Sequence, residues 1–185
     1  MNQQLFLSER GTLIGNKIPK DYFVTRGKGE SNITIHAGSY HLALKDAEIE
    51  MCNIMYYSSI LPKIATEIDK PKLIHGSVMD TIMAVSSVKK GKRATAGIMY
   101  GWLHNKITDE KYGGLVVEYN GSLSENEMEK QLTSSLNELY TNGYSEEFKL
   151  RDISLISESF IPKKKFGTAL VALCFTSYII PKIDL

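Results

Sequence analysis

Two adjacent hydroxyl side chains, Ser58 and Ser59, are the residues of this sequence best placed to act on their own backbone. They follow a hydrophobic run at residues 51–57, which predicts a short buried strand, and they precede Pro62, which cannot continue a strand ladder. In a tight bend at that point, the Ser59 hydroxyl can attack the Ser58 carbonyl carbon and convert the peptide bond into an ester. β-Elimination and hydrolysis then leave a pyruvoyl ketone at residue 59, which is an electron sink made without an added cofactor.

The serine pair also fits an ordinary turn, because serine favours the position where a strand ends. Two further pairs, Ser86-Ser87 and Ser134-Ser135, lie in patterns that predict helices. The choice between an ordinary turn and a reactive bend therefore depends on the elements predicted around the serine pair.

Length and composition predict a single domain over residues 1–185, with 43% hydrophobic and 23% charged residues. The net charge of +1 gives no electrostatic reason to expect nucleic acid or an anionic membrane as a partner. No apolar run approaches the length of a membrane span, and residues 1–10 do not read as a signal peptide, so we expect a cytoplasmic protein. Cys52 and Cys174 lie in apolar segments and predict buried thiols rather than a disulfide or a metal site.

Three helices are expected from caps and apolar periodicity. The first begins at Ser39 and runs for about ten residues. The second is capped by Ser77 and has an apolar stripe over residues 78–85. The third begins with the capping box of Ser124 and Glu127 and ends at Gly143.

Strands are expected at residues 22–25, 32–36, 51–57, 94–103, 113–119, 151–160 and 168–179, after a loosely attached arm at residues 1–20. Residues 26–31 read as a flexible glycine-containing loop, with a phosphate cradle as the weaker alternative. Because the strands do not alternate strictly with helices, the order favours an α+β layered sandwich over a doubly wound parallel sheet.

The order of these pieces resembles the pyruvoyl-dependent arginine decarboxylases from about residue 25 to residue 175. The resemblance rests on residues 27–31 (GKGES), Asn53, residues 57–62 (YSSILP), residues 113–119 (GGLVVEY) and residues 165–167 (KFG) with Ala169, Ala172 and Phe175. It implies a four-layer αββα sandwich and a self-cleaving proenzyme, cut into residues 1–58 (the β chain) and 59–185 (the α chain). It also implies a homotrimer, or a hexamer made of two trimers, with active sites between subunits.

The resemblance further implies a carboxy-lyase that converts the small molecule arginine to agmatine and CO₂. The reaction would run through a Schiff base with the pyruvoyl group of Ser59, without pyridoxal phosphate and without a metal. In this reading Ser58 and Ser59 form the cleavage site, Asn53 assists self-processing, and Glu118 returns a proton to the substrate carbon.

The residues themselves support Glu118 as a proton donor, because a carboxyl between Val117 and Tyr119 on a buried strand would keep its proton to higher pH. The alternative for Glu118 is a carboxylate that faces solvent or pairs with a lysine. The alternative for Asn53 is a strand residue that satisfies a neighbouring backbone group.

One position departs from the family. The family carries an acid after an aromatic residue in the first helix, where it pairs with the guanidinium of arginine, and here His41 follows Tyr40. An imidazole cannot replace a carboxylate as a bidentate guanidinium partner. An acid from a neighbouring subunit, another substrate such as ornithine or lysine, a non-processing trimeric relative without activity, and a merely exposed His41 are therefore the open alternatives.

Overall fold

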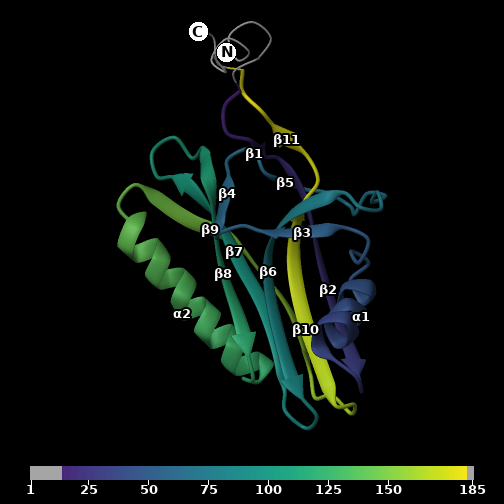
Figure 1. Cartoon of the computed structure of the whole chain (residues 1–185). Coiled ribbons are helices and arrows are strands. Elements are labelled where there is room, and N and C mark those ends of the chain that lie inside the picture. The colour runs from purple at the N-terminus through teal and green to yellow at the C-terminus, as the bar shows by residue number, and fades with distance from the viewer. Residues whose placement is uncertain (1–13, 183–185) are drawn as a thin grey trace, which may run out of the picture.

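The computed structural model of the chain describes residues 14–182 and shows two β-sheets that lie face to face (Figure 1). The α+β class predicted from the sequence is confirmed. The first sheet has the strand order β3 (Asn53–Tyr56), β6 (Val78–Lys89), β10 (Phe166–Phe175), β2 (Asp21–Ser31) and β5 (Thr66–Glu67). The second has the order β4 (Ile60–Pro62), β8 (Lys111–Gly121), β7 (Ala94–Asn105) and β9 (Phe148–Phe160).

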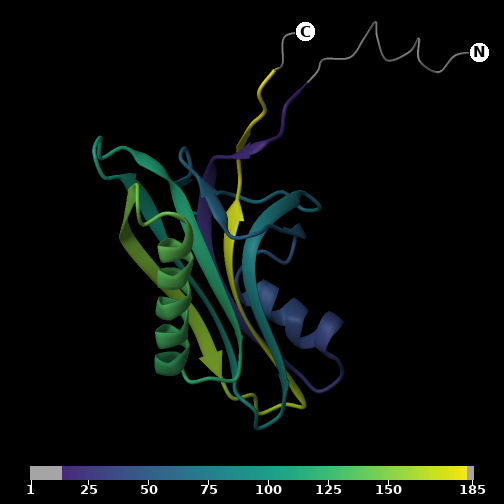
Figure 2. The ribbon, with the colours of Figure 1, turned by 90° about the vertical axis from the view of Figure 1, so that its left-hand side faces the viewer.

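The apolar core between the sheets explains why they stack. Ile82, Val171 and Leu173 from the first sheet meet Ile98 and Val116 from the second in one fully buried cluster. Figure 2 shows the two helices on opposite outer sides of the sheets: α1 (His41–Asp46) covers the first sheet and α2 (Glu125–Gly143) the second. The serine pair lies between β3 and β4, at the point where the chain passes from one sheet to the other.

Helix α2 is the element that the sequence predicts best. Its capping box, Ser124 with Glu127, is present, and the Ser124 N–H donates to the Glu127 carboxylate at 3.0 Å. Met128, Leu132 and Leu136 are buried against the second sheet, and they define the packed face of α2. The neighbouring face of the helix lies next to β8 without being buried.

The predicted loop at residues 26–31 is wrong, because these residues continue strand β2. A side-chain carbon placed at Gly27 would overlap the backbone of Ala43, and one at Gly29 would overlap that of Ser39. The two glycines therefore let the first helical segment lie directly on β2, and they do not form a phosphate cradle.

The helix predicted after Ser77 is also wrong, because β6 occupies this segment. Ile82 packs between the sheets, while Met79 and Met83 pack toward α1, so both faces of the strand are buried. A strand buried on both faces is apolar almost throughout, and such a run also contains a helical stripe. Ser86-Ser87 accordingly lies in a strand.

Three expectations near the first helix need correction. Residues 32–36 do not form a strand, because a π-helical segment, Ile35–Tyr40, leads directly into the six residues of α1. Ser39 lies within this helical stretch, and its buried hydroxyl pairs with that of Thr168 at 2.9 Å. The strand expected at residues 51–57 is the shorter β3, an edge strand on which Tyr56 is 59% exposed.

The expected N-terminal arm is partly attached to the body. Residues 1–13 lie outside the described residues, but β1 (Ile18–Pro19) pairs with β11 (Tyr178–Ile179). Lys17 forms an ion pair with the buried Asp80 of β6, with its ammonium 5.6 Å from the centre of the Tyr57 ring. Within residues 14–182, no helix is both long and apolar enough to cross a membrane.

Candidate active site

The serine pair occupies a three-residue turn. The carbonyl oxygen of Ser58 accepts a hydrogen bond from the Ile60 N–H at 3.0 Å, and Ser59 does not have a positive φ, so the turn is of the inverse γ type. The Ser59 carbonyl oxygen accepts from the Val116 N–H at 3.1 Å, which ties the turn to β8. Both carbonyl groups of the serine pair are therefore held by backbone donors.

The hydroxyl of Ser59 lies against a carboxylate. Its Oγ donates toward Glu118, with Oε1 at 3.0 Å and Oε2 at 3.1 Å. The two residues are brought together because β4 pairs with β8, with Ile60 opposite Leu115. A hydroxyl beside a proton acceptor, next to a carbonyl whose oxygen already accepts an N–H, is the arrangement that acyl transfer requires.

Glu118 is exposed in the single chain rather than buried as its strand pattern predicts. The surrounding atoms nevertheless remove water from its carboxyl, and this desolvation raises the pKa of Glu118 above its ordinary value, although the Ser59 hydrogen bond opposes the shift. The carboxyl can therefore exchange protons with the Ser59 position and still hold a proton to higher pH than an ordinary glutamate.

A cavity of about 500 Å³ lies over Ser59 and Glu118, between β8 and α2. This volume falls within the usual range of sites for small molecules. Its remaining lining consists of Val116 and Val117 from β8 and of Ser135, Glu138, Leu139 and Asn142 from α2.

Comparison with known proteins decides what this site belongs to. The family model of pyruvoyl-dependent arginine decarboxylase matches residues 21–179. The chain belongs to this family. The sequence is 31% identical to the pyruvoyl-dependent arginine decarboxylase AaxB of Chlamydia muridarum, over 89% of this chain and 94% of that protein. It is 29% identical to a probable pyruvoyl-dependent arginine decarboxylase of Chlorobaculum parvum, over 64% and 70% of the two chains.

A third relative, a pyruvoyl-dependent arginine decarboxylase of Methanopyrus kandleri, is 39% identical over 36% of this chain and 43% of its own length. These matches confirm the predicted family and with it the predicted enzyme class, a decarboxylase with a pyruvoyl cofactor. The residues present fit that group, because its precursor Ser59 has its hydroxyl facing a carboxylate inside a cavity.

Two residues that the family resemblance assigned to the site lie elsewhere in the single chain. The side-chain amide of Asn53 donates to the Gly76 carbonyl at 3.0 Å, at the opposite end of β3 from the serine pair. The length of β3 is about 10 Å at the usual strand rise, so Asn53 does not contact Ser59. His41 is exposed at the start of α1, on the outer face of the first sheet, whereas the cavity lies on the outer face of the second.

Sequence reasoning missed the contributions of the Ile60 N–H and of α2. A backbone donor carries no signature in residue type, so nothing in the sequence could have identified the Ile60 N–H. The four α2 residues that line the cavity do have a signal, because they recur at helical spacing on one face of a helix whose register the capping box fixes.

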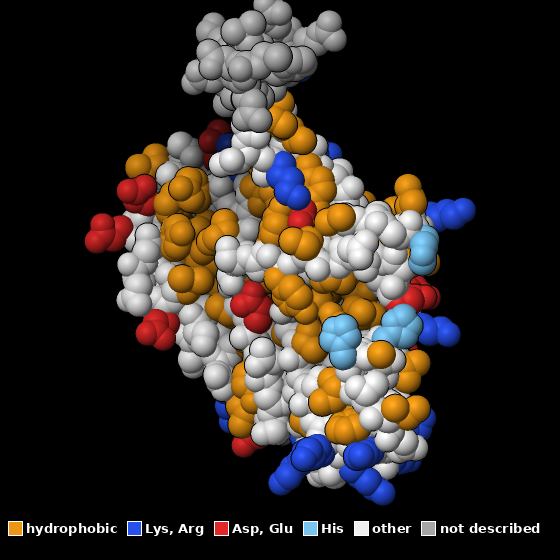
Figure 3. Space-filling view, viewed as in Figure 1, with side chains coloured by type: hydrophobic (Ala, Val, Ile, Leu, Met, Phe, Trp, Pro, Cys, Tyr) orange, Lys and Arg blue, Asp and Glu red, His pale blue; other side chains and the backbone are white. Residues whose placement is uncertain are grey.

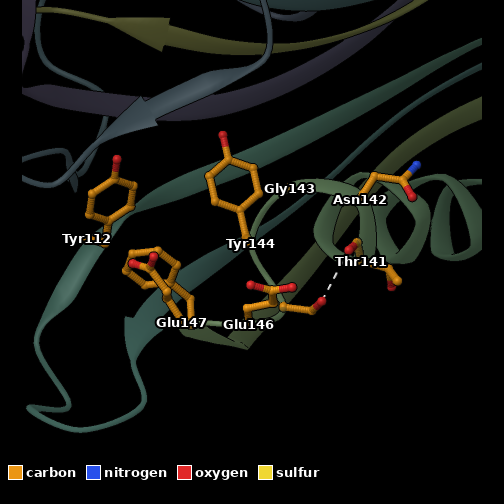
Figure 4. A pocket seen from close by; sticks show the side chains of 9 residues that line it. Tyr112, Thr141, Asn142, Gly143, Tyr144, Glu146 and Glu147 are labelled. Carbon is orange, nitrogen blue, oxygen red and sulfur yellow. Dashed lines mark hydrogen bonds between the residues drawn. The ribbon is translucent and has the colours of Figure 1, made fainter.

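A second cavity of about 500 Å³ lies beyond the carboxyl end of α2, and Asn142 lines both cavities. Figure 4 shows the Tyr112 and Tyr144 rings pointing the same way, with the Glu146 and Glu147 carboxylates set apart from them. This cavity contains no residue of the serine pair, so it is not the reactive centre. Among residues 14–182, no three His, Cys, Asp or Glu side chains are grouped so that they could hold a metal ion.

Proposed function

We propose that this chain is a single-domain proenzyme that cleaves itself between Ser58 and Ser59 and then decarboxylates arginine to agmatine and CO₂. The observation that carries the proposal is the hydrogen bond that the Ser59 hydroxyl, in the γ-turn, donates to Glu118 on β8. Cleavage would give a β chain of residues 1–58 and an α chain of residues 59–185.

In the cleavage step, the Ser59 Oγ attacks the Ser58 carbonyl carbon and its proton passes to the Glu118 carboxylate. The Ile60 N–H stabilises the charge that develops on the Ser58 oxygen. The carbon–nitrogen bond between the serines breaks, an ester forms, and the nitrogen of residue 59 takes up a proton. Elimination of the ester releases the Ser58 carboxylate and leaves dehydroalanine, which takes up water and loses ammonia to become the pyruvoyl group.

The pyruvoyl group supplies an electron sink for the carbanion that remains when the substrate loses CO₂. Glu118 supplies the proton that this carbon needs, and desolvation keeps that proton on the carboxyl to a higher pH than usual. The Val117 and Leu139 side chains exclude water from one wall of the cavity and receive the methylene groups of the substrate.

We also propose that the two sheets and two outer helices form the αββα sandwich of the family, and that copies assemble as a homotrimer or a pair of trimers. Figure 3 shows hydrophobic side chains gathered over β3 on the face that carries the site. Met55, Tyr56 and Ile60, which flank the serine pair, are each more than half exposed. Such a patch around a reactive centre supports its burial by a second copy, which would bring Asn53 and His41 to a neighbouring site.

The experiment that tests the proposal compares wild type, Ser59→Ala and Ser134→Ala, which lies on α2 outside the Ser59 cavity. Wild type and Ser134→Ala should run as two fragments on a denaturing gel, with masses matching residues 1–58 and a ketone-capped 59–185, and should form agmatine from arginine. Ser59→Ala should remain one inactive chain. Cleavage of Ser59→Ala at the same bond, or an uncleaved wild type without activity, would contradict the proposal.

Asn53 gives a second test of the assembled site. Asn53→Ala should slow cleavage if the residue reaches the serine pair of a neighbouring copy. Cleavage at the wild-type rate in a variant that still forms the wild-type oligomer would remove Asn53 from the mechanism.

A further inference from the structure

Helix α2 presents an acid to the cavity that holds the serine pair. Ser135, Glu138, Leu139 and Asn142 recur at intervals of three and four residues, so they lie on one face of α2, beside its buried face. Glu138 is the acidic side chain that this face contributes to the cavity. The cavity therefore contains two carboxyl groups, one from β8 and one from α2.

The two carboxyl groups have different surroundings. Glu118 is engaged by the Ser59 hydroxyl through both of its oxygens. Within the described part of the chain, Glu138 makes no ion pair with a lysine, arginine or histidine. Glu138 is thus available to a cation that enters the cavity.

A guanidinium that loses water in a binding site needs an acidic partner, because an unpaired charge without its water is costly. The first helix carries His41 where the family has its acid, and His41 lies on the other side of the single chain. A carboxylate on α2 can take over the pairing, since a glutamate accepts two parallel N–H bonds from a guanidinium.

We infer that Glu138 binds the cationic end of the substrate and is the residue that selects arginine over neutral amino acids. This inference rests on the proposed function, because it takes the reacting end of the substrate to lie at residue 59. The aliphatic part of the substrate then lies along Val117 and Leu139, and the tail ends between Glu138 and Asn142, whose amide oxygen accepts a further N–H.

The test compares wild type, Glu138→Gln, Glu138→Asp and Glu129→Gln. Glu129→Gln removes the same charge from the same helix, but Glu129 lines a different cavity. Arginine is compared with citrulline, in which a neutral urea group replaces the guanidinium, and kcat and KM are measured separately for each. Cleavage is followed on a gel for every variant.

Glu138→Gln should cleave normally and should raise KM for arginine about 10- to 100-fold, since bonds to charged groups are the stronger ones. The kcat should change little, and the constants for citrulline should be unaffected. Glu138→Asp should recover part of the arginine preference. Glu129→Gln should behave as wild type toward both compounds.

A Glu138→Gln enzyme that cleaves normally and keeps the wild-type preference for arginine over citrulline would overturn the inference and leave the proposed function intact. A second measurement does not depend on turnover. Agmatine binding is measured by calorimetry on the uncleaved Ser59→Ala chain, with and without Glu138→Gln. Binding that weakens about tenfold or more supports Glu138 as the cation site even if arginine is not decarboxylated, and unchanged binding overturns it.

Discussion

The Ile60 nitrogen lies 3.0 Å from the Ser58 carbonyl oxygen, so a backbone donor points at the atom that would become negatively charged in the proposed attack by the Ser59 hydroxyl. This donor belongs to the turn itself and needs no side chain. It is therefore complete within the single chain.

Replacing Ile60 by proline removes this donor. Loss of one such donor costs about 10²- to 10³-fold in related acyl transfers, so Ile60→Pro should slow cleavage by about that factor. The rate is measured from the disappearance of the intact chain on a denaturing gel. Ile60→Ala, which keeps the N–H and changes only a side chain that is 54% exposed, should cleave nearly as fast as wild type. Equal rates for the proline and alanine variants would exclude the donor role.

Substitutions of Glu118 separate its two proposed tasks. Glutamine keeps an oxygen that accepts from the Ser59 hydroxyl but cannot take up its proton, so Glu118→Gln should cleave more slowly than wild type and, once cleaved, should lose about 10²- to 10⁴-fold in decarboxylation. Leucine keeps neither property, so Glu118→Leu should lose both reactions. Gel analysis and agmatine formation measure the two separately, and an active Glu118→Gln enzyme would reject Glu118 as the donor.

The pH dependence of turnover should follow the carboxyl of Glu118. Protonation of Glu118 is what the substrate carbon requires, and desolvation raises its pKa. The kcat should therefore stay high through the range in which an ordinary glutamate, with a pKa of about 4.3, has already ionised, and should fall as pH rises through the raised pKa. A profile that rises with pH across this range would mean that the ionised form is the active one.

The ion pair of Lys17 and Asp80 should stabilise the fold between weakly acidic and weakly alkaline pH. Burial is the largest single effect and would raise the pKa of Asp80, but hydrogen bonds from Lys17, Tyr178 and Tyr57 together lower it. The contribution is therefore present above the unfolded value of about 3.9 and is lost as pH falls through the folded value. The hydrogen bond to Asp80 raises the pKa of Lys17, so the contribution is also lost in strong alkali.

Lys17→Met should lower the free energy of unfolding at pH 7 by about 1–2 kcal/mol. This is less than the effect of breaking a fully buried ion pair, because the Lys17 side chain is 45% exposed and solvent screens its charge. Urea unfolding of the uncleaved Ser59→Ala chain measures this, and the difference should disappear as pH falls through the lowered pKa of Asp80. Lys20→Met, which breaks the neighbouring pair with Asp21 on the surface, should change the free energy by less than about 0.5 kcal/mol. An equal effect of both substitutions would contradict a special role for Asp80.

His41 tests whether a neighbouring copy contributes to the substrate site. In a site shared between copies, His41→Asp should leave cleavage unchanged and should lower KM for arginine relative to ornithine and lysine, because a second carboxylate would reach the guanidinium. The matched control is His36→Asp, which places the same charge on the exposed π-helical segment before α1. Unchanged constants for all three amino acids would mean that His41 lies outside the site.

Local signals explain which parts of the fold could be predicted. The Ser124 and Glu127 capping box and the stripe of α2 lie within a few turns of chain, and this helix was predicted correctly. The segment of strand β6 predicts a helix because both faces of the strand are buried, one in the core between the sheets and the other against α1. Its buried residues therefore show no alternation that would reveal a strand.

The same distinction applies to the site. The serine pair and Pro62 lie within five consecutive residues, so the bend was predictable from the sequence. The contact of Ser59 with Glu118, in contrast, joins residues 59 positions apart. The separation of Asn53 from Ser59 became visible only with the bounds of β3. The position of Glu138 in the cavity could be found only from the register of α2 together with the pairing of β4 with β8.

Strand β2 occupies an interior position in the first sheet, and every residue of β10 pairs with one of its residues. The proposed cleavage after Ser58 would leave β2 in one polypeptide and β10 in the other. Folding of the intact chain is a first-order process, but refolding of the cleaved enzyme needs two separate polypeptides to meet and is second order. The proposed cleavage would thus convert an equilibrium stability into a kinetic one, and recovery after denaturation should depend on protein concentration for a cleaved enzyme but not for the Ser59→Ala chain.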